Sequence, residues 1–106
     1  MDKRMRARLE AAGWRVGSVQ EFLGLSNDEM AYIEIRLVLS DQLKKRRAAK
    51  RISQVKLAKL LSSSQSRVAK MEAADPTVSL DLLIRSLLAT GHSPAEIGKA
   101  IARAGS

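Results

Sequence analysis

The hydrophobic and polar positions of the chain alternate with a helical period along most of its length. No proline or glycine occurs from Ser26 to about Lys50, and Ser26 with Glu29 has the spacing of a capping box. Four apolar residues of this stretch recur roughly on one side of a helix: Met30, Ile33, Leu37 and Leu43. The pattern predicts one long helix, and a break near Ser40-Asp41 is the alternative because several strand-prone residues precede it.

Residues 53–74 predict two short helices separated by a turn of three serines. The first helix is expected to bury one apolar side, formed by Val55, Leu57, Ala58 and Leu61. Ser64 can cap the second helix with its hydroxyl, and Val68 and Met71 give that helix one narrow buried stripe. The remainder of the second helix is polar and basic, so it gains little from packing.

Two further helices are predicted after Pro76, which cannot continue a helix. Ser79 caps the first of them, and its wide apolar face leads us to expect the central core element: Leu80, Leu83, Ile84, Leu87 and Leu88. Gly91 ends that helix. Residues 93–96 then provide an N-cap, a proline and a capping-box glutamate for a last small helix, which packs on the core or on another subunit.

The first 27 residues form an extension to this pattern. A short amphipathic helix is predicted within residues 2–12, and Ser18 has capping-box spacing for a single helical turn. Between them, Trp14 and Val16 alternate with Arg15 and predict a brief strand. Such a strand must pair with this chain, a second copy or a partner protein, whereas the alternative is that Trp14 covers one end of the core. We therefore divide the chain into an N-terminal extension (1–27) and a helical domain (28–106).

Composition restricts the class of protein. Hydrophobic residues make up 45% of the chain, enough for one domain with one core, and only three residues are aromatic, so the core is aliphatic. Cysteine is absent, which excludes disulfides and thiolate metal sites. Apolar runs are too short for a membrane span, and no apolar signal core follows the basic start. We expect a cytoplasmic protein with no membrane partner.

The net charge of +8 indicates a polyanionic partner. No acidic residue lies between Asp41 and Glu72, so the basic excess is concentrated in and just before the two short helices. Gln65 can pair bidentately with adenine, Lys70 can donate to guanine, and Ser66 can bond to a base or a phosphate. Arg67 can serve either group. An ordinary solvated first helical turn is the alternative for Gln65 and Ser66.

Candidate catalytic residues are scarce. The single histidine, His92, follows a glycine and is expected to be a solvated loop residue. Acidic residues are scattered, and the glycines match no nucleotide-binding fingerprint. We therefore expect no enzymatic activity, no cofactor and no metal.

Residues 43–89 resemble the helix-turn-helix domain of the lambda-type phage repressors and of the xenobiotic-response-element regulators. The resemblance is carried by Ser53-Gln54, Leu57-Ala58, the turn 62–64, Gln65-Ser66, Val68, Met71-Glu72 and the helix from Leu80 to Leu88. It implies an all-α fold, a five-helix lambda-repressor-like bundle, here with the short N-terminal helix and strand extension. It also implies a homodimer that binds double-stranded operator DNA.

The resemblance assigns roles by position. Gln65, Ser66 and Lys70 match the residues that read base edges, and Gln54 matches a glutamine that bonds a phosphate and its neighbour. Arg47 and Glu72 match an internal ion pair. The remaining candidate phosphate contacts come from charge and position: Ser64, Arg67, Arg46 and Lys50. Two departures are Ser62, where glycine is frequent, and residues 73–75, which lack the usual Asn-Gly.

The segment around Trp14 and Val16 resembles the leader of antitoxins that act beside a RelE-like toxin. If the resemblance holds, the protein represses its own operon and neutralises a toxin through these residues. Two alternatives stay open. One is a stand-alone phage-type repressor, and the other is a basic helix (42–51) that binds RNA or an anionic membrane without sequence specificity.

Overall fold

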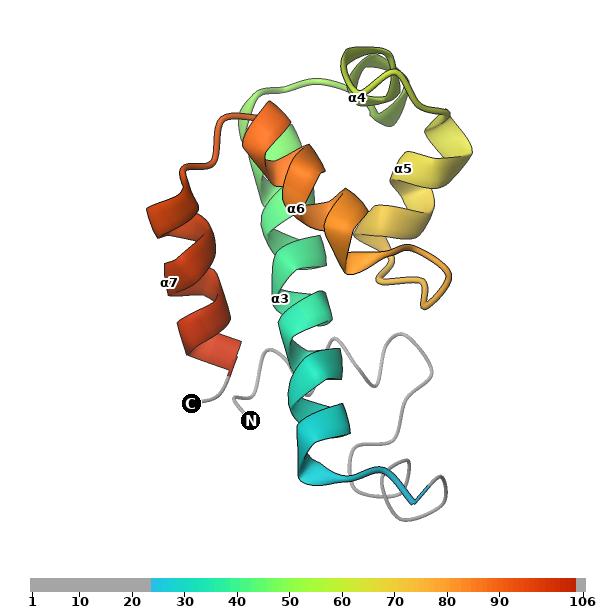
Figure 1. Cartoon of the computed structure of the whole chain (residues 1–106). Helices are drawn as coiled ribbons and strands as arrows, with labels where there is room; N and C mark the ends of the chain where they lie inside the picture. Colours follow the sequence, from blue (N-terminus) through green and yellow to red (C-terminus); the bar gives the residue numbers. More distant parts are fainter. Residues whose placement is uncertain (1–23, 105–106) are drawn as a thin grey trace.

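The computed structural model describes residues 24–104, which form five helices and no strand (Figure 1). The helices are α3 (Asn27–Ala49), α4 (Gln54–Leu60), α5 (Gln65–Glu72), α6 (Leu80–Ala89) and α7 (Pro94–Ala104). The all-α, five-helix architecture predicted from the sequence is confirmed. The predicted strand at Trp14–Val16 and the helical turns at 2–12 and after Ser18 lie outside the described residues.

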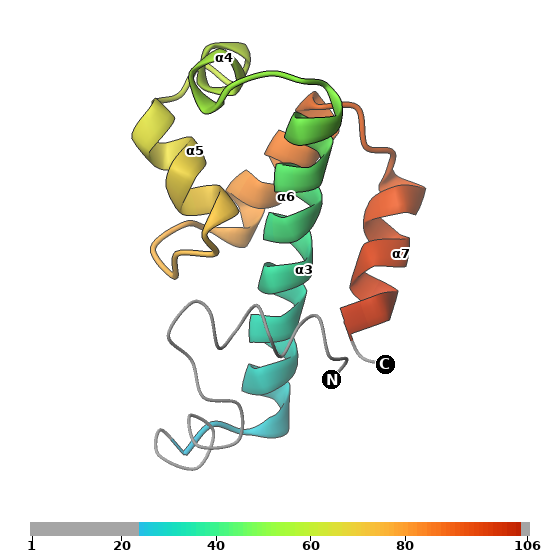
Figure 2. The same cartoon turned by 180° about the vertical axis from the view of Figure 1, so that it is seen from behind.

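Helix α3 is the centre of the bundle. It begins where predicted, because the Ser26 hydroxyl accepts a hydrogen bond from the Glu29 amide at 3.1 Å, and it continues without a break past Ser40. Four consecutive residues, 37–40, are buried, so neighbours surround α3 on every side at this level. Helix α7 lies along one side and α5 and α6 lie on the other (Figures 1 and 2). The expectation that residues 80–88 form the central element is therefore wrong.

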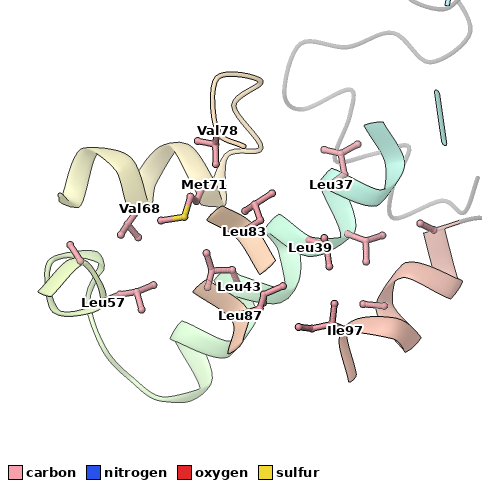
Figure 3. Close-up of a cluster of buried hydrophobic side chains, with 14 residues drawn as sticks. Leu37, Leu39, Leu43, Leu57, Val68, Met71, Val78, Leu83, Leu87 and Ile97 are labelled. Carbon is pink, nitrogen blue, oxygen red and sulfur yellow. The ribbon is translucent and has the colours of Figure 1, made fainter. Parts of the chain in front are cut away.

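The core joins side chains from all five helices. Leu39 and Leu43 of α3 meet Leu83 and Leu87 of α6, while Leu57, Val68 and Met71 close the end formed by α4 and α5 (Figure 3). Each of these seven side chains has at most 1% of its surface exposed. This small aliphatic core fixes α5 to α3 through Val68 and Met71.

Two residues expected in the core are exposed instead. Val55 is 52% exposed because α4 has only seven residues and packs through Leu57 and Ala58, which leaves the side that carries Val55 facing solvent. Leu88 is 46% exposed. It stands about 100° around α6 from the fully buried Leu87, on the side turned away from α3.

Four helices end with one residue in the left-handed conformation: Arg51, Ser62, Ala74 and Gly91. In each case two backbone amides after the helix donate hydrogen bonds to carbonyl groups of its last turn. After α4, for example, the Ser62 amide donates to the Lys59 carbonyl and the Ser63 amide to the Ala58 carbonyl. This arrangement satisfies carbonyl groups that a helix end leaves without partners. Three of the four positions are not glycine. The connections are thus short and tightly hydrogen-bonded, which holds α4, α5 and α6 at defined angles.

Candidate nucleic-acid interface

The turn between α4 and α5 sets the orientation of the two short helices. Ser53 caps α4 and Ser64 caps α5, because each hydroxyl accepts a hydrogen bond of 3.1 Å from the amide three residues later. Ser62, between them, has a φ of 52°, as its place in the turn requires. The chain therefore reverses within three serines, and α5 leaves the turn with its first residues in solvent.

One side of α5 is buried and the other side is polar. Val68 and Met71 have no exposed surface, whereas Gln65, Ser66 and Lys70 are all exposed. Arg67 is exposed beside them. The structure thus places the three predicted base-reading residues on the solvent-accessible part of α5. This surface carries the Gln65 amide, the Ser66 hydroxyl, the Arg67 guanidinium and the Lys70 ammonium group.

A chain of hydrogen bonds connects this surface to α3. Arg47 of α3 donates to both carboxylate oxygens of Glu72 at the end of α5, from Nε to Oε2 at 2.6 Å and from Nη2 to Oε1 at 3.0 Å. Gln54 at the start of α4 donates to Glu72 Oε1 at 3.3 Å. Gln65 then donates to Gln54 Oε1 at 2.7 Å. The chain Arg47–Glu72–Gln54–Gln65 therefore links three helices.

This chain has a fixed direction. An ionised carboxylate only accepts hydrogen bonds, so Gln54 must turn its NH₂ group towards Glu72 and its carbonyl oxygen towards Gln65. Gln65 must then turn its own NH₂ group to Gln54. Its carbonyl oxygen and its second N–H remain for a ligand, and one acceptor with one donor is the pair that adenine requires in the major groove.

The ion pair at the base of the chain is largely withdrawn from water. The side chains of Arg47 and Glu72 are 19% and 4% exposed. The hydrogen bond to Glu72 raises the pKa of Arg47 above its ordinary value, although burial acts against this shift. Arg47 also donates to the Ile52 carbonyl at 2.9 Å. Each of its three guanidinium nitrogens donates to another part of the protein, so it holds α3, α5 and the start of α4 together.

Arg46 and Lys50 lie elsewhere. Arg46 donates to His92 Nδ1 at 3.3 Å and to Glu96 Oε2 at 3.2 Å, at the junction of α6 and α7. Lys50 Nζ lies 3.8 Å from the position that a Cβ would take at Gly91. Arg46 lies in the last turn of α3 and Lys50 caps its end, and both lie near the loop between α6 and α7, whereas Arg47 faces α5. Their phosphate contacts stay predictions, and the structure does not group them with Gln65.

His92 is buried, so the expectation of a solvated loop histidine is wrong. Only 8% of its surface is exposed, because the loop between α6 and α7 folds it against α3, where its Nδ1 accepts from Arg46. Burial, and secondarily the charge of Arg46, lowers its pKa. Within residues 24–104, no three histidine or acidic residues are grouped in a way that would hold a metal ion.

A depression beside α5 is not predicted by the sequence. Arg67 and Lys70 form one wall, Thr77 and Ser79 form part of the other, and the volume is about 190 Å³. Asp75 shapes this second wall, because its Oδ1 accepts from both the amide and the hydroxyl of Thr77 at 2.8 and 2.6 Å. An Asp two residues before a Thr was the available signal for such a turn. Its position beside α5 depends on tertiary packing.

The comparison with known proteins decides the family. A family model described as helix-turn-helix matches residues 43–99, from the second half of α3 to the middle of α7. The chain belongs to the helix-turn-helix family. No curated protein and no solved structure matches it. The matched domain is a DNA-binding regulatory domain, so this helix-turn-helix protein is a transcription regulator whose ligand is double-stranded DNA. No helix within residues 24–104 is long and apolar enough to cross a membrane.

Proposed function

We propose that the protein is a sequence-specific repressor that inserts α5 into the major groove of its operator. The observation that carries this proposal is the directed chain Arg47–Glu72–Gln54–Gln65, which holds the exposed Gln65 and leaves its carbonyl oxygen and one N–H for a ligand. An exposed glutamine is usually free to rotate. One held in a single orientation suits the reading of a base edge, because the ordering entropy is lost before binding.

The surrounding charges support contact with the DNA backbone. Arg67 and Lys70 border the depression beside α5, and the hydroxyls of Thr77 and Ser79 border its other side. A phosphate oxygen that follows the groove edge would meet the Arg67 guanidinium and the two hydroxyls, while Gln65, Ser66 and Lys70 face the bases. The Ser64 hydroxyl oxygen accepts a hydrogen bond from the Arg67 amide. Its hydroxyl hydrogen can still donate to a phosphate oxygen.

We further propose that two copies bind together. A homodimer would place two α5 helices in successive major grooves, with half-sites about 34 to 36 Å apart. The antitoxin role is the finer part of the proposal. It depends on Trp14 and Val16, which lie outside the described residues. Co-expression with a toxic product of the neighbouring gene tests it, because rescue of growth that is lost on Trp14→Ala supports the role and unchanged rescue contradicts it.

DNA binding by the full chain tests the main proposal. We would measure fluorescence anisotropy on duplex DNA from upstream of the gene and on a scrambled duplex, over a range of salt concentrations. The native duplex is expected to bind about 1,000-fold more tightly than the scrambled one. Equal binding to both, lost as salt rises, would contradict sequence-specific reading and would favour the non-specific alternative.

Substitutions then locate the reading surface. Gln65→Ala and Lys70→Ala should each weaken binding to the native duplex by about 5- to 150-fold while thermal unfolding stays unchanged. Gln42→Ala and Lys45→Ala are the matched controls, since they remove the same groups from α3, and Lys45 is paired with Asp41. If both α5 variants bind as the controls do, α5 is not the recognition helix.

A further inference from the structure

Arg36 of α3 connects the long helix to the loop after α5. Its Nη2 donates to the backbone carbonyl of Asp75 at 2.9 Å and to the carbonyl of Val78. Its Nη1 donates to the Tyr32 hydroxyl at 3.3 Å, and its guanidinium carbon lies 5.7 Å from the centre of the Tyr32 ring. Tyr32 stands one turn earlier on the same helix and contacts the guanidinium in addition to the loop.

The two carbonyls that Arg36 contacts are the ends of one tight turn. The Val78 amide donates to the Asp75 carbonyl at 3.1 Å, and the Asp75 side chain holds Thr77 inside the turn. The turn follows the left-handed Ala74, which closes the C-terminal end of α5, and it is followed directly by Ser79, which caps α6. Arg36 thus fixes the connection through which α5 and α6 keep their relative positions.

The turn lies between the core and the depression beside α5. Val78 is 6% exposed and belongs to the core, and it also borders the depression, together with the exposed Thr77 and Ser79 and with Arg67 and Lys70. Arg36 bonds the Asp75 and Val78 carbonyls from the α3 side of the turn. It therefore determines how far the wall that contains Thr77 and Ser79 lies from α5. Moving the turn would change the spacing between the hydroxyls on one wall and the basic groups on the other.

We propose that Arg36 is a positioning residue for operator recognition, which braces the 75–78 turn so that α5 and the start of α6 can contact DNA together. The inference rests on the proposed function. Arg36 lies in α3, before the segment 43–99 that the family model matches, whereas the turn that it contacts lies inside that segment. It acts through the turn and does not itself touch DNA.

Amide hydrogen exchange of the free full-length protein tests the brace without DNA. In Arg36→Met, the amides of Thr77 and Val78 should exchange about tenfold faster relative to amides in the middle of α3, which report global unfolding. Arg36→Lys keeps the charge and can reach one carbonyl, so it should give an intermediate result. If the turn amides change only in step with those of α3, Arg36 does not brace the turn.

DNA binding tests the consequence. Arg36→Met should weaken binding to the native duplex by about tenfold, because a displaced turn puts the phosphate contacts of the depression out of register with the base contacts of α5. Binding to the scrambled duplex, where α5 reads no bases, should change by less than about threefold. Val38→Ala is the control, because it removes core volume from the same helix and leaves the turn intact. An equal loss in Val38→Ala, or an equal loss on both duplexes in Arg36→Met, would overturn the proposal. If the wild-type protein binds the native and the scrambled duplex equally, the proposed function is refuted. The hydrogen-exchange result does not depend on DNA, so it still decides whether Arg36 braces the turn.

Discussion

Ser62 carries the conformational cost of the turn between α4 and α5. Its φ of 52° lies in the left-handed region, where an L-residue with a Cβ is strained by roughly 1 to 2 kcal/mol. The side chain is exposed, so it gains nothing from packing that would offset the strain. The hydrogen bonds from the Ser62 and Ser63 amides to α4 hold the conformation in place.

Ser62→Gly should therefore stabilise the protein by about 0.5 to 1 kcal/mol. The strain energy that it removes from the folded state is larger than the free energy by which the flexibility of glycine stabilises the unfolded state. Urea unfolding measures the change. The same substitution at Ser66, inside α5, is the matched control and should destabilise by about 0.5 kcal/mol. A loss of stability at both positions would mean that the turn is not strained at Ser62.

At the scale of elements, helix starts were predictable and helix neighbours were not. Ser26, Ser53, Ser64 and Ser79 each accept the amide three residues later, and the capping signals at Ser26, Ser64 and Ser79 were read from local sequence. A cap depends only on adjacent residues. The burial of His92 and the exposure of Val55 depend on which side of an element meets a distant one, and no local pattern contains that information.

The Arg47–Glu72 pair is the element-scale contact that positions α5. Arg47→Met takes the guanidinium away from the buried Glu72 carboxylate, so it should cost about 3 to 5 kcal/mol of unfolding free energy. Arg47→Lys should cost less, because it keeps the charge but cannot contact both carboxylate oxygens and the Ile52 carbonyl at once. Urea unfolding at constant pH measures both variants.

A double-mutant cycle shows whether the loss comes from the pair. Arg47→Met combined with Glu72→Met should cost clearly less than the sum of the two single changes, since the double variant removes both charges together. The exposed pair Lys45–Asp41, 2.9 Å apart on α3, is the control and should couple by less than about 1 kcal/mol. Additive losses at Arg47 and Glu72 would mean that the ion pair does not hold α5.

At the scale of the whole molecule, the fold class and the exposed polar surface of α5 could be predicted from the sequence because the helix-turn-helix is a nearly continuous segment. Gln65, Ser66 and Lys70 lie within six residues of one another, and helical periodicity alone places them outside the core. The brace from Arg36 to Val78 joins residues 42 positions apart. A lone arginine in a basic chain gives no signal of such a contact, so only the packed structure reveals it.

Three titrating groups make the stability of the whole fold depend on pH in the same direction. Burial, followed by the charge of Arg46, lowers the pKa of His92 below its ordinary 6.5, in a site that Glu96, Lys99 and Arg103 of α7 also border. Hydrogen bonds from Ser93 lower the pKa of Glu96 below 4.5, and hydrogen bonds from Thr77 lower that of Asp75 below 3.8. In each case the unfolded chain binds its proton at a higher pH than the folded chain does. Stability must therefore fall as the solution becomes more acidic.

The loss should occur in two stages. Below about pH 6.5 the unfolded state protonates His92 first, so the urea midpoint should already be lower at pH 5.5 than at pH 7.5. The carboxylates contribute only below about pH 4.5. His92→Gln stays neutral and can still accept from Arg46, so it should remove the first stage and keep the second. If the variant loses as much stability as the wild type between pH 7.5 and 5.5, the acid sensitivity arises outside the contact between α3 and the α6–α7 junction.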